Sequence, residues 1–150
     1  MRYFLIFIVV ASIAFSCKHI NVYEKLVDLP RHEWKRNQNA VIRFDITDSS
    51  RHQLYLVVRH TQQYPFNKLL VRLLIQDTAK RTIGSMHLNA PLTNSRGNWI
   101  GTSMDDIYYS RIKINPPVFL RPGSYRFVLQ QAMKEEVIPY ILNVGIALNQ

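Results

Sequence analysis

Apolar residues recur along most of the chain in runs of strand length, with polar turn residues between them. The turns include Asp48-Ser49-Ser50, Asn94–Asn98 and Arg121-Pro122-Gly123, whose Asp, Asn, Pro and Gly residues favour tight reversals of the backbone. Apolar runs bounded in this way predict β-strands. The expected strands are Val22–Leu29, Ala40–Thr47, Gln53–His60, Lys68–Gln76, Thr82–Asn89, Ile107–Ile114, Ser124–Gln131 and Ile141–Leu148.

The periodicity within these runs indicates how each strand is buried. Ile42, Phe44 and Ile46 alternate with charged positions, which is typical of a strand with one face in the core. The runs in 53–60 and 68–76 are more continuously apolar, as expected for central strands. Only 132–137 predicts a helical turn. Eight strands with almost no helix predict an all-β fold, an antiparallel β-sandwich of jelly-roll-like topology in one domain, residues 22–150.

The first residues of the chain carry a different pattern. One positive charge, Arg2, precedes an apolar run from Tyr3 to Phe15 that only Ser12 interrupts. A helix of that length spans about 20 Å, less than the roughly 30 Å hydrocarbon core of a bilayer. A short apolar run behind a positive charge, ending at small residues, is typical of a secretory signal peptide. We therefore expect residues 1–16 to direct export and to be removed.

The single cysteine, Cys17, directly follows Ala14-Phe15-Ser16. This arrangement resembles a bacterial lipobox, where cleavage occurs before a cysteine that becomes lipid-modified; the alternative is a soluble periplasmic protein. The lipobox interpretation predicts a lipoprotein signal peptide at 1–16 and a lipidated tether at 17–21, anchored stably by several acyl chains. Processing leaves 134 residues with a net charge of +8. A lone cysteine excludes an internal disulfide and a two- or four-cysteine zinc site.

The charge balance narrows the choice of partners. Nineteen Lys and Arg against ten Asp and Glu give a net charge of +9, which by itself suggests nucleic acid or an anionic surface. The basic residues are spread from Lys18 to Lys134 rather than gathered in a stripe, and an exported protein rarely meets nucleic acid. We therefore expect no nucleic-acid partner. Basic residues within strands either face an acidic partner or anionic lipid, or are simply solvated.

The sequence contains no pattern that carries catalysis or holds a metal. No two histidines have the spacing that places both imidazoles on one strand face or one helix face, so we expect no metal and no cofactor. No nucleophile elbow, phosphate-binding glycine loop or HExxH motif occurs, and we expect a protein that is not an enzyme. Asp105-Asp106 is either a carboxylate pair for a cation or basic segment, or part of a backbone turn, which we favour.

Aromatic residues near Asp105 leave a second interpretation open. Trp99 stands between Gly97 and Gly101, and Tyr108-Tyr109 place one ring on each face of an expected strand. Such rings are suited to stacking on a sugar. Burial of aromatic bulk in a small sandwich explains them equally well.

Several stretches taken together resemble the gliding-motility lipoprotein GldH family of Bacteroidota. They are VYEKLVDLP, HEWKRNQNAVIRFDITD, LYLVVRHTQQYPFNKLLVRL, GNWIGTSMDDIYYSRIKI and RPGSYRFVLQQAMKEEVIPYILNVGIAL, which together run from Val22 to Leu148. Arg59-His60-Thr61 with Tyr64-Pro65, and Trp99 to Ile107, are the more specific parts. Ser103 replaces an expected glycine. The resemblance implies an envelope lipoprotein needed for gliding, linked to type IX secretion, with no known enzymatic activity.

From these observations we predict that the protein is a non-enzymatic adaptor, anchored by Cys17, that binds other motility or secretion proteins. Its expected partner surface is formed by the Arg59–Asn67 and Trp99–Asp106 loops, with Arg59, His60, Tyr64, Trp99, Asp105 and Asp106 as candidate contacts. The alternative is a carbohydrate- or peptidoglycan-binding module, and a third interpretation is a hydrolase pairing Asp105 or Asp106 with a histidine. In Bacteroidota, acidic residues after the lipidated cysteine favour surface export. Lys18–Asn21 has none, so we expect an outer-membrane anchor with the domain facing the periplasm.

Overall fold

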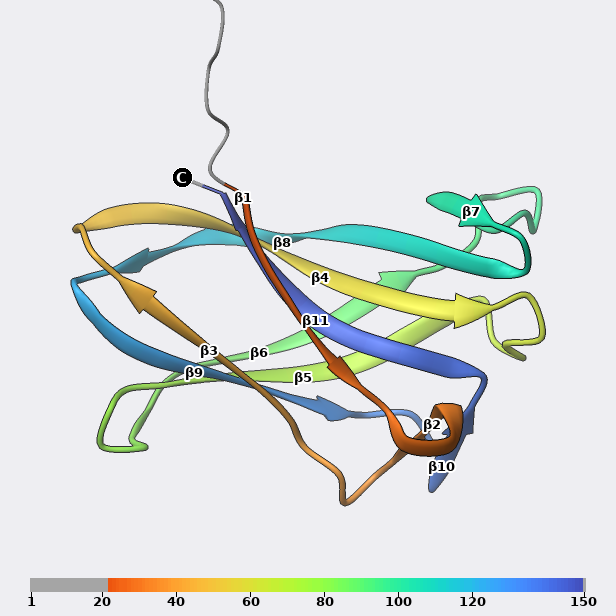
Figure 1. The fold of residues 1–150 in the computed structure, drawn as a ribbon, viewed down its shortest axis with the longest axis horizontal. Coiled ribbons are helices and arrows are strands. Elements are labelled where there is room, and N and C mark those ends of the chain that lie inside the picture. The colour runs from red at the N-terminus through yellow and green to blue at the C-terminus, as the bar shows by residue number, and fades with distance from the viewer. Residues whose placement is uncertain (1–21, 150) are drawn as a thin grey trace, which may run out of the picture.

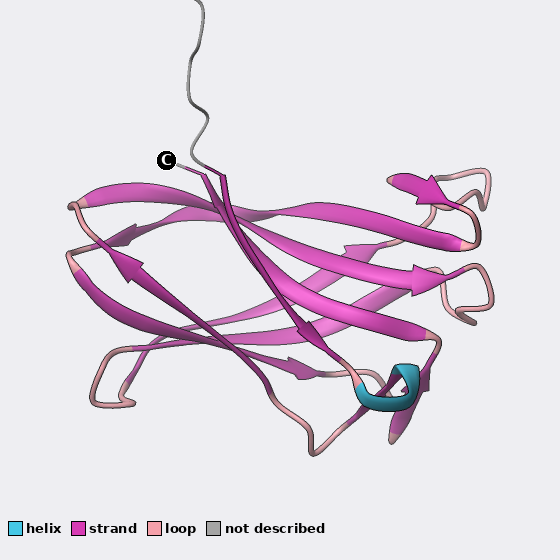
Figure 2. Cartoon of the chain, viewed as in Figure 1, coloured by secondary structure: helices cyan, strands magenta, loops and turns pink. Residues whose placement is uncertain are grey.

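The structure is a computed structural model that describes residues 22–149 (Figure 1). The expected signal peptide, the tether and Cys17 lie outside these residues. Within them the chain forms strands almost throughout, with one short 3-10 turn, η1 (Pro30–His32) (Figure 2). The strands are β1 (Val22–Asp28), β2 (Glu33–Lys35), β3 (Ala40–Ile46), β4 (Ser50–Thr61), β5 (Lys68–Gln76), β6 (Thr82–Pro91), β7 (Thr102–Met104), β8 (Ile107–Leu120), β9 (Gly123–Gln131), β10 (Val137–Pro139) and β11 (Ile141–Asn149).

Two antiparallel sheets form the sandwich. The five-stranded sheet has the order β1-β11-β4-β8-β7, and the four-stranded sheet has the order β3-β9-β5-β6. When the eight long strands are numbered along the chain, these orders become 1-8-3-6 and 2-7-4-5, the order of a jelly roll. The predicted all-β sandwich is therefore confirmed. Each of the eight expected strands is present, but the strand count within residues 22–149 is eleven. The short strands β2, β7 and β10 are additional, and β2 pairs with β10 as a separate ribbon.

The core lies between the two sheets and follows the alternation seen in the sequence. Ile42, Phe44 and Ile46 of β3 are buried while Arg43 and Asp45 between them are exposed. The largest fully buried side chains come from both sheets and from the β2–β10 ribbon; they include Trp34, Leu54, Leu56, Leu69, Leu73, Phe127 and Ile138. Removal of this apolar surface from water, at about 25 cal/mol per Å², is the main source of stability.

The predicted helical turn at 132–137 is wrong. Residues 132–136 form a bend, and Val137 begins β10, which pairs with β2. The side chain of Gln131 holds this bend, because its Oε1 accepts from the amide of Met133 at 2.9 Å and its Nε2 donates to the carbonyl of Glu135 at 2.8 Å. These two bonds satisfy backbone groups that a helical turn would otherwise pair.

Strand β8 of the five-stranded sheet extends further than the sequence predicts. The expected strand ended at Ile114, whereas β8 continues through a cis Asn115-Pro116 bond and Pro117 to Leu120. On one side β8 pairs with β4, and on the other it pairs with β7 only over Ile107–Tyr109. Pro116 and Pro117 therefore lie beside the free side of β8 and at the register shift opposite His52 and Leu54 of β4, two positions where a strand tolerates a missing N–H.

Candidate functional site

Three of the six candidate residues meet in one aromatic cluster on the inner side of the five-stranded sheet. His60, near the end of β4, is fully buried, and its ring centroid lies 4.7 Å from that of Trp99 and 5.2 Å from that of Tyr64. Tyr108 of β8 stacks on His60 with the centroids 5.7 Å apart. Phe66 packs edge-on against Tyr64. The cluster joins the 62–67 loop and the 92–101 loop to the ends of β4 and β8.

Hydrogen bonds and burial fix the protonation of this cluster. His60 Nδ1 donates to the Thr61 carbonyl at 2.8 Å, while its Nε2 is buried and has no hydrogen-bond partner. Burial lowers the pKa of His60, an effect that the bond to Thr61 partly opposes. The Tyr64 hydroxyl donates to the Lys68 carbonyl, and burial raises the pKa of Tyr64. Both rings are therefore neutral at pH 7.

The loop that carries Trp99 is held by a short set of local bonds. Asn94 Oδ1 accepts from the amides of Arg96 and Asn98, and the backbone of Ile100 returns to Leu92. Gly101 follows with a φ of 97°, and a Cβ there would lie 2.1 Å from the Tyr109 carbonyl oxygen. Only glycine fits this close approach. The loop therefore turns Trp99 inward, where it is half-buried against the core.

The other three candidates lie on the opposite, outer face of the same sheet. Neighbouring strand residues point to opposite faces, so Arg59 is directed away from the cluster that holds His60. Arg59, Asp105 and Asp106 line a groove of about 490 Å³. The groove is completed by Leu26 of β1, residues 102–104 of β7, and Ile107 and Tyr109 of β8. The structure thus divides the expected surface between two faces.

The rim of this groove is the tight turn between β7 and β8. Asp105 occupies it with a φ of 55°, and both aspartates are exposed, as the turn interpretation requires. Met104, directly before them, is 79% exposed. At the opposite wall, the Tyr109 hydroxyl donates to Glu24 Oε2 at 2.6 Å, which ties β8 across the sheet to β1. Burial and this bond raise the pKa of Tyr109 to about 12.

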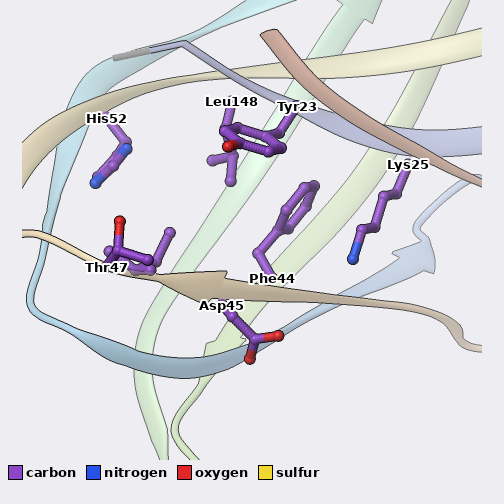
Figure 3. A pocket seen from close by; sticks show the side chains of 8 residues that line it. Tyr23, Lys25, Phe44, Asp45, Thr47, His52 and Leu148 are labelled. Carbon is purple, nitrogen blue, oxygen red and sulfur yellow. The ribbon is translucent and has the colours of Figure 1, made fainter. Parts of the chain in front are cut away.

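A second pocket, which no sequence pattern predicts, lies at the end of the sandwich where β1 begins and β11 ends. This pocket of about 360 Å³ lies between β1 and β3, with Phe44 and Leu148 in its wall (Figure 3). Lys25 bridges the gap: its Nζ donates to the Arg43 carbonyl at 2.7 Å and lies 5.1 Å from the centroid of the Phe44 ring. His52 is buried there, with Nε2 3.0 Å from Ser50 Oγ.

The positions of these side chains can be compared with the two other interpretations, a hydrolase and a carbohydrate-binding module. No histidine lines the groove that holds Asp105 and Asp106, so the hydrolase pairing has no support there. Trp99 and Tyr108 face each other and His60 within the cluster, which does not favour them as open stacking platforms. Among residues 22–149, no group of three His, Cys, Asp or Glu residues could hold a metal ion. In the same part of the chain, no helix has the length and apolar character to cross a membrane.

Fold and surface together define a jelly-roll domain with a groove on one sheet face and an aromatic cluster behind it. The model of the family described as GldH lipoprotein matches residues 21–148, and the chain belongs to that family. Its relatives include the gliding motility lipoprotein GldH of Flavobacterium johnsoniae, which is 25% identical over 155 residues, covering 97% of this chain and 94% of the relative. The chain is thus a gliding-motility lipoprotein, and its family is not a known enzyme family.

Solved structures show more distant similarity. The VP2 subviral particle of infectious bursal disease virus is 11% identical with a TM-score of 0.42, over 88% of this chain and 33% of that one. Latent PorU from Porphyromonas gingivalis is 11% identical with a TM-score of 0.38, over 87% and 13%. A family 35 carbohydrate-binding module from Clostridium thermocellum is 9% identical with a TM-score of 0.38, over 85% and 91%.

Proposed function

We propose that this protein is a non-enzymatic adaptor of the gliding machinery, tethered by a lipid on Cys17 and binding other motility or type IX secretion proteins. Family membership supports the setting, and the sequence Ala14-Phe15-Ser16-Cys17 supports the anchor. The anchor lies in the outer membrane, and the domain faces the periplasm, because no acidic residue follows Cys17 before Val22.

The outer groove is the partner surface in this proposal. The observation that carries it is Met104, a large apolar side chain at the end of β7 that is 79% exposed and lines the groove together with Leu26, which is 37% exposed. Methionine and arginine are enriched at protein interfaces. Such interfaces usually have an apolar centre surrounded by a polar or charged rim. Arg59 on one side and Asp105 and Asp106 on the other supply that rim.

The test is cross-linking of partners in intact envelopes, followed by mass spectrometry of the proteins joined to the chain. Met104→Glu places a charge in the centre of the groove without touching the core, so we expect loss of motility or secretion proteins from the cross-linked set and loss of colony spreading. Val137→Glu is the matched control, since Val137 is also exposed but lies on β10. Equal recovery of partners with both variants would overturn the assignment of the groove.

The anchor and its orientation have separate tests. Cys17→Ala is expected to abolish the lipid-dependent increase in mass and to release the protein from the membrane fraction. Protease added to intact cells is expected to leave the domain whole, and to degrade it once the outer membrane is permeabilised. A Cys17→Ala protein that stays in the membrane with unchanged mass would contradict the anchor.

A further inference from the structure

β6 is the outermost strand of the four-stranded sheet, and its free edge differs from the other edges of the sandwich. It pairs with β5 on one side, and within the described residues no backbone hydrogen bond reaches its other side. An unpaired edge is a template for a further strand, and proteins usually protect such edges by charge, proline or short length. β6 is ten residues long and contains no Asp, Glu, Lys or Arg.

The remaining edges carry the usual protection. β1 has Glu24, Lys25 and Asp28 within seven residues, and β3 has Arg43 and Asp45. β7 is three residues long. The free part of β8 includes charged residues and the adjacent prolines 116 and 117. In a chain with a net charge of +9, β6 is thus the edge that another positively charged molecule can approach with least repulsion.

In Figure 1, β6 lies on the side away from the viewer. A shallow apolar groove, lined in part by residues of β6, runs beside this edge. Its volume is about 280 Å³, and Met86, Pro117 and Val118 are among the residues that line it. Two large apolar side chains at its mouth, Ile83 and Phe119, are 55% and 54% exposed. Apolar surface is thus exposed next to the free edge of β6.

We propose that β6 pairs antiparallel with β6 of a second copy, forming a two-fold dimer with one continuous eight-stranded sheet. Pairing of β6 with β5 is irregular where β6 begins, between Ile75 and Gln76 of β5, so the regular part of β6 runs from Gly84. A register centred on His87 aligns this regular part with itself and stops at Pro91, which has no N–H for the ladder.

This register matches side chains on both faces. On the inner face it sets half-buried Met86 opposite Leu88 of the second copy, and Gly84 opposite Ala90. On the outer face, exposed Ser85 meets Asn89 and His87 meets its own counterpart. Apolar residues thus face apolar residues and polar face polar, which is the pairing that stabilises neighbouring strands. A partner strand needs small or apolar inward residues and, in a positively charged partner, no added positive charge; β6 of a second copy meets both conditions.

The symmetry is compatible with two anchors in one membrane. The two-fold axis relating antiparallel strands runs perpendicular to their sheet, so both copies present the same sheet to the same side. Val22, where the described chain begins, and Asn149 pair with each other in the five-stranded sheet. Both N-terminal ends therefore lie on one side of the dimer, and anchoring in a shared membrane would favour the association.

Cysteine cross-linking of the full, processed chain in its own envelope tests the pairing. His87→Cys places two thiols directly opposite at about 5 Å between Cβ atoms, so a short bismaleimide is expected to give a covalent dimer on a denaturing gel. Ser85→Cys is the matched control on the same strand, because its counterpart lies four residues away along the ladder. Arg43→Cys on the β3 edge and the unsubstituted chain control for random collision.

Sedimentation of the detergent-solubilised chain gives an independent measure. We expect twice the protomer mass, and we expect His87→Lys to raise the dimer dissociation constant by up to about fivefold, because like charges directly opposite on paired strands repel. His87 is exposed, so the fold of the protomer is not at risk. A monomer mass at all concentrations would overturn the proposal, and so would His87→Cys cross-linking no better than Ser85→Cys or Arg43→Cys.

Discussion

Replacing Trp99 by alanine tests whether this residue supports the fold or contacts a partner. The substitution removes ring contacts to His60 at 4.7 Å, Tyr108 at 5.9 Å and Tyr64 at 6.2 Å. Truncation of a fully buried Phe or Trp costs about 3–5 kcal/mol, and each aromatic pair adds about 0.5–1.5 kcal/mol beyond burial. Trp99 is only half-buried, so the free energy of unfolding should fall by about 2–4 kcal/mol.

Urea unfolding of the chain lacking its first 17 residues measures this loss. Trp34 is fully buried and remains as the fluorescent reporter after Trp99 is removed. Trp99→Phe keeps a ring against His60 and should lose less than half as much. The m-value should not change, because the same surface is exposed on unfolding. A loss below about 0.5 kcal/mol, together with loss of gliding, would refute the packing argument and return Trp99 to the partner surface.

Gly145→Ala should lower the free energy of unfolding by about 1–3 kcal/mol, because the added Cβ would lie 2.2 Å from the Lys25 carbonyl oxygen; denaturant melts measure it, and a neutral result would contradict the close packing of β1. Since burial lowers the pKa of His60, the unfolded chain binds the proton more readily, so stability should decline as the pH falls below about 6.5, and His60→Phe should flatten that decline. The pKa of Tyr109 is raised to about 12 from 10.0, so stability present below pH 10 should fall as the pH rises toward 12, and thermal melts of Tyr109→Phe should show a smaller fall.

The strands could be predicted from the sequence because their signals are local. Alternation in β3 and turn residues such as Asp48 and Gly123 place strand ends without knowledge of the partner strands. The bend at 132–136 could not be predicted in this way. It depends on the Gln131 side chain and on pairing of Val137 with Lys35, about a hundred residues away in the sequence.

The sequence named six candidate residues, but it did not predict that they lie on two opposite faces of the sheet. Arg59 and His60 are adjacent in a strand, so the two-residue period already separates them onto opposite faces. That signal was present in the sequence. Trp99 is different, because its inward direction follows from Gly101 packing on Tyr109, a contact between the loop and β8 that no local pattern indicates. The exposed position of Met104 depends likewise on pairing of β7 with β8.

The position of β1 determines how a pull applied at Val22, the first described residue, would enter the domain. β1 is an edge strand held along its length by β11, and its first residue, Val22, pairs with Asn149 at the very end of that ladder. Tension applied at Val22 and directed away from the sheet should therefore break the seven residue pairs between β1 and β11 one after another, starting at Val22, instead of shearing all seven at once. Three side-chain hydrogen bonds of β1 oppose this opening: Tyr109 donates to Glu24, Lys25 donates to the Arg43 carbonyl, and Asn143 donates to Asp28. We therefore expect the force that detaches β1 from Val22 onward to depend on these contacts, which such a pull would meet one after another along the strand.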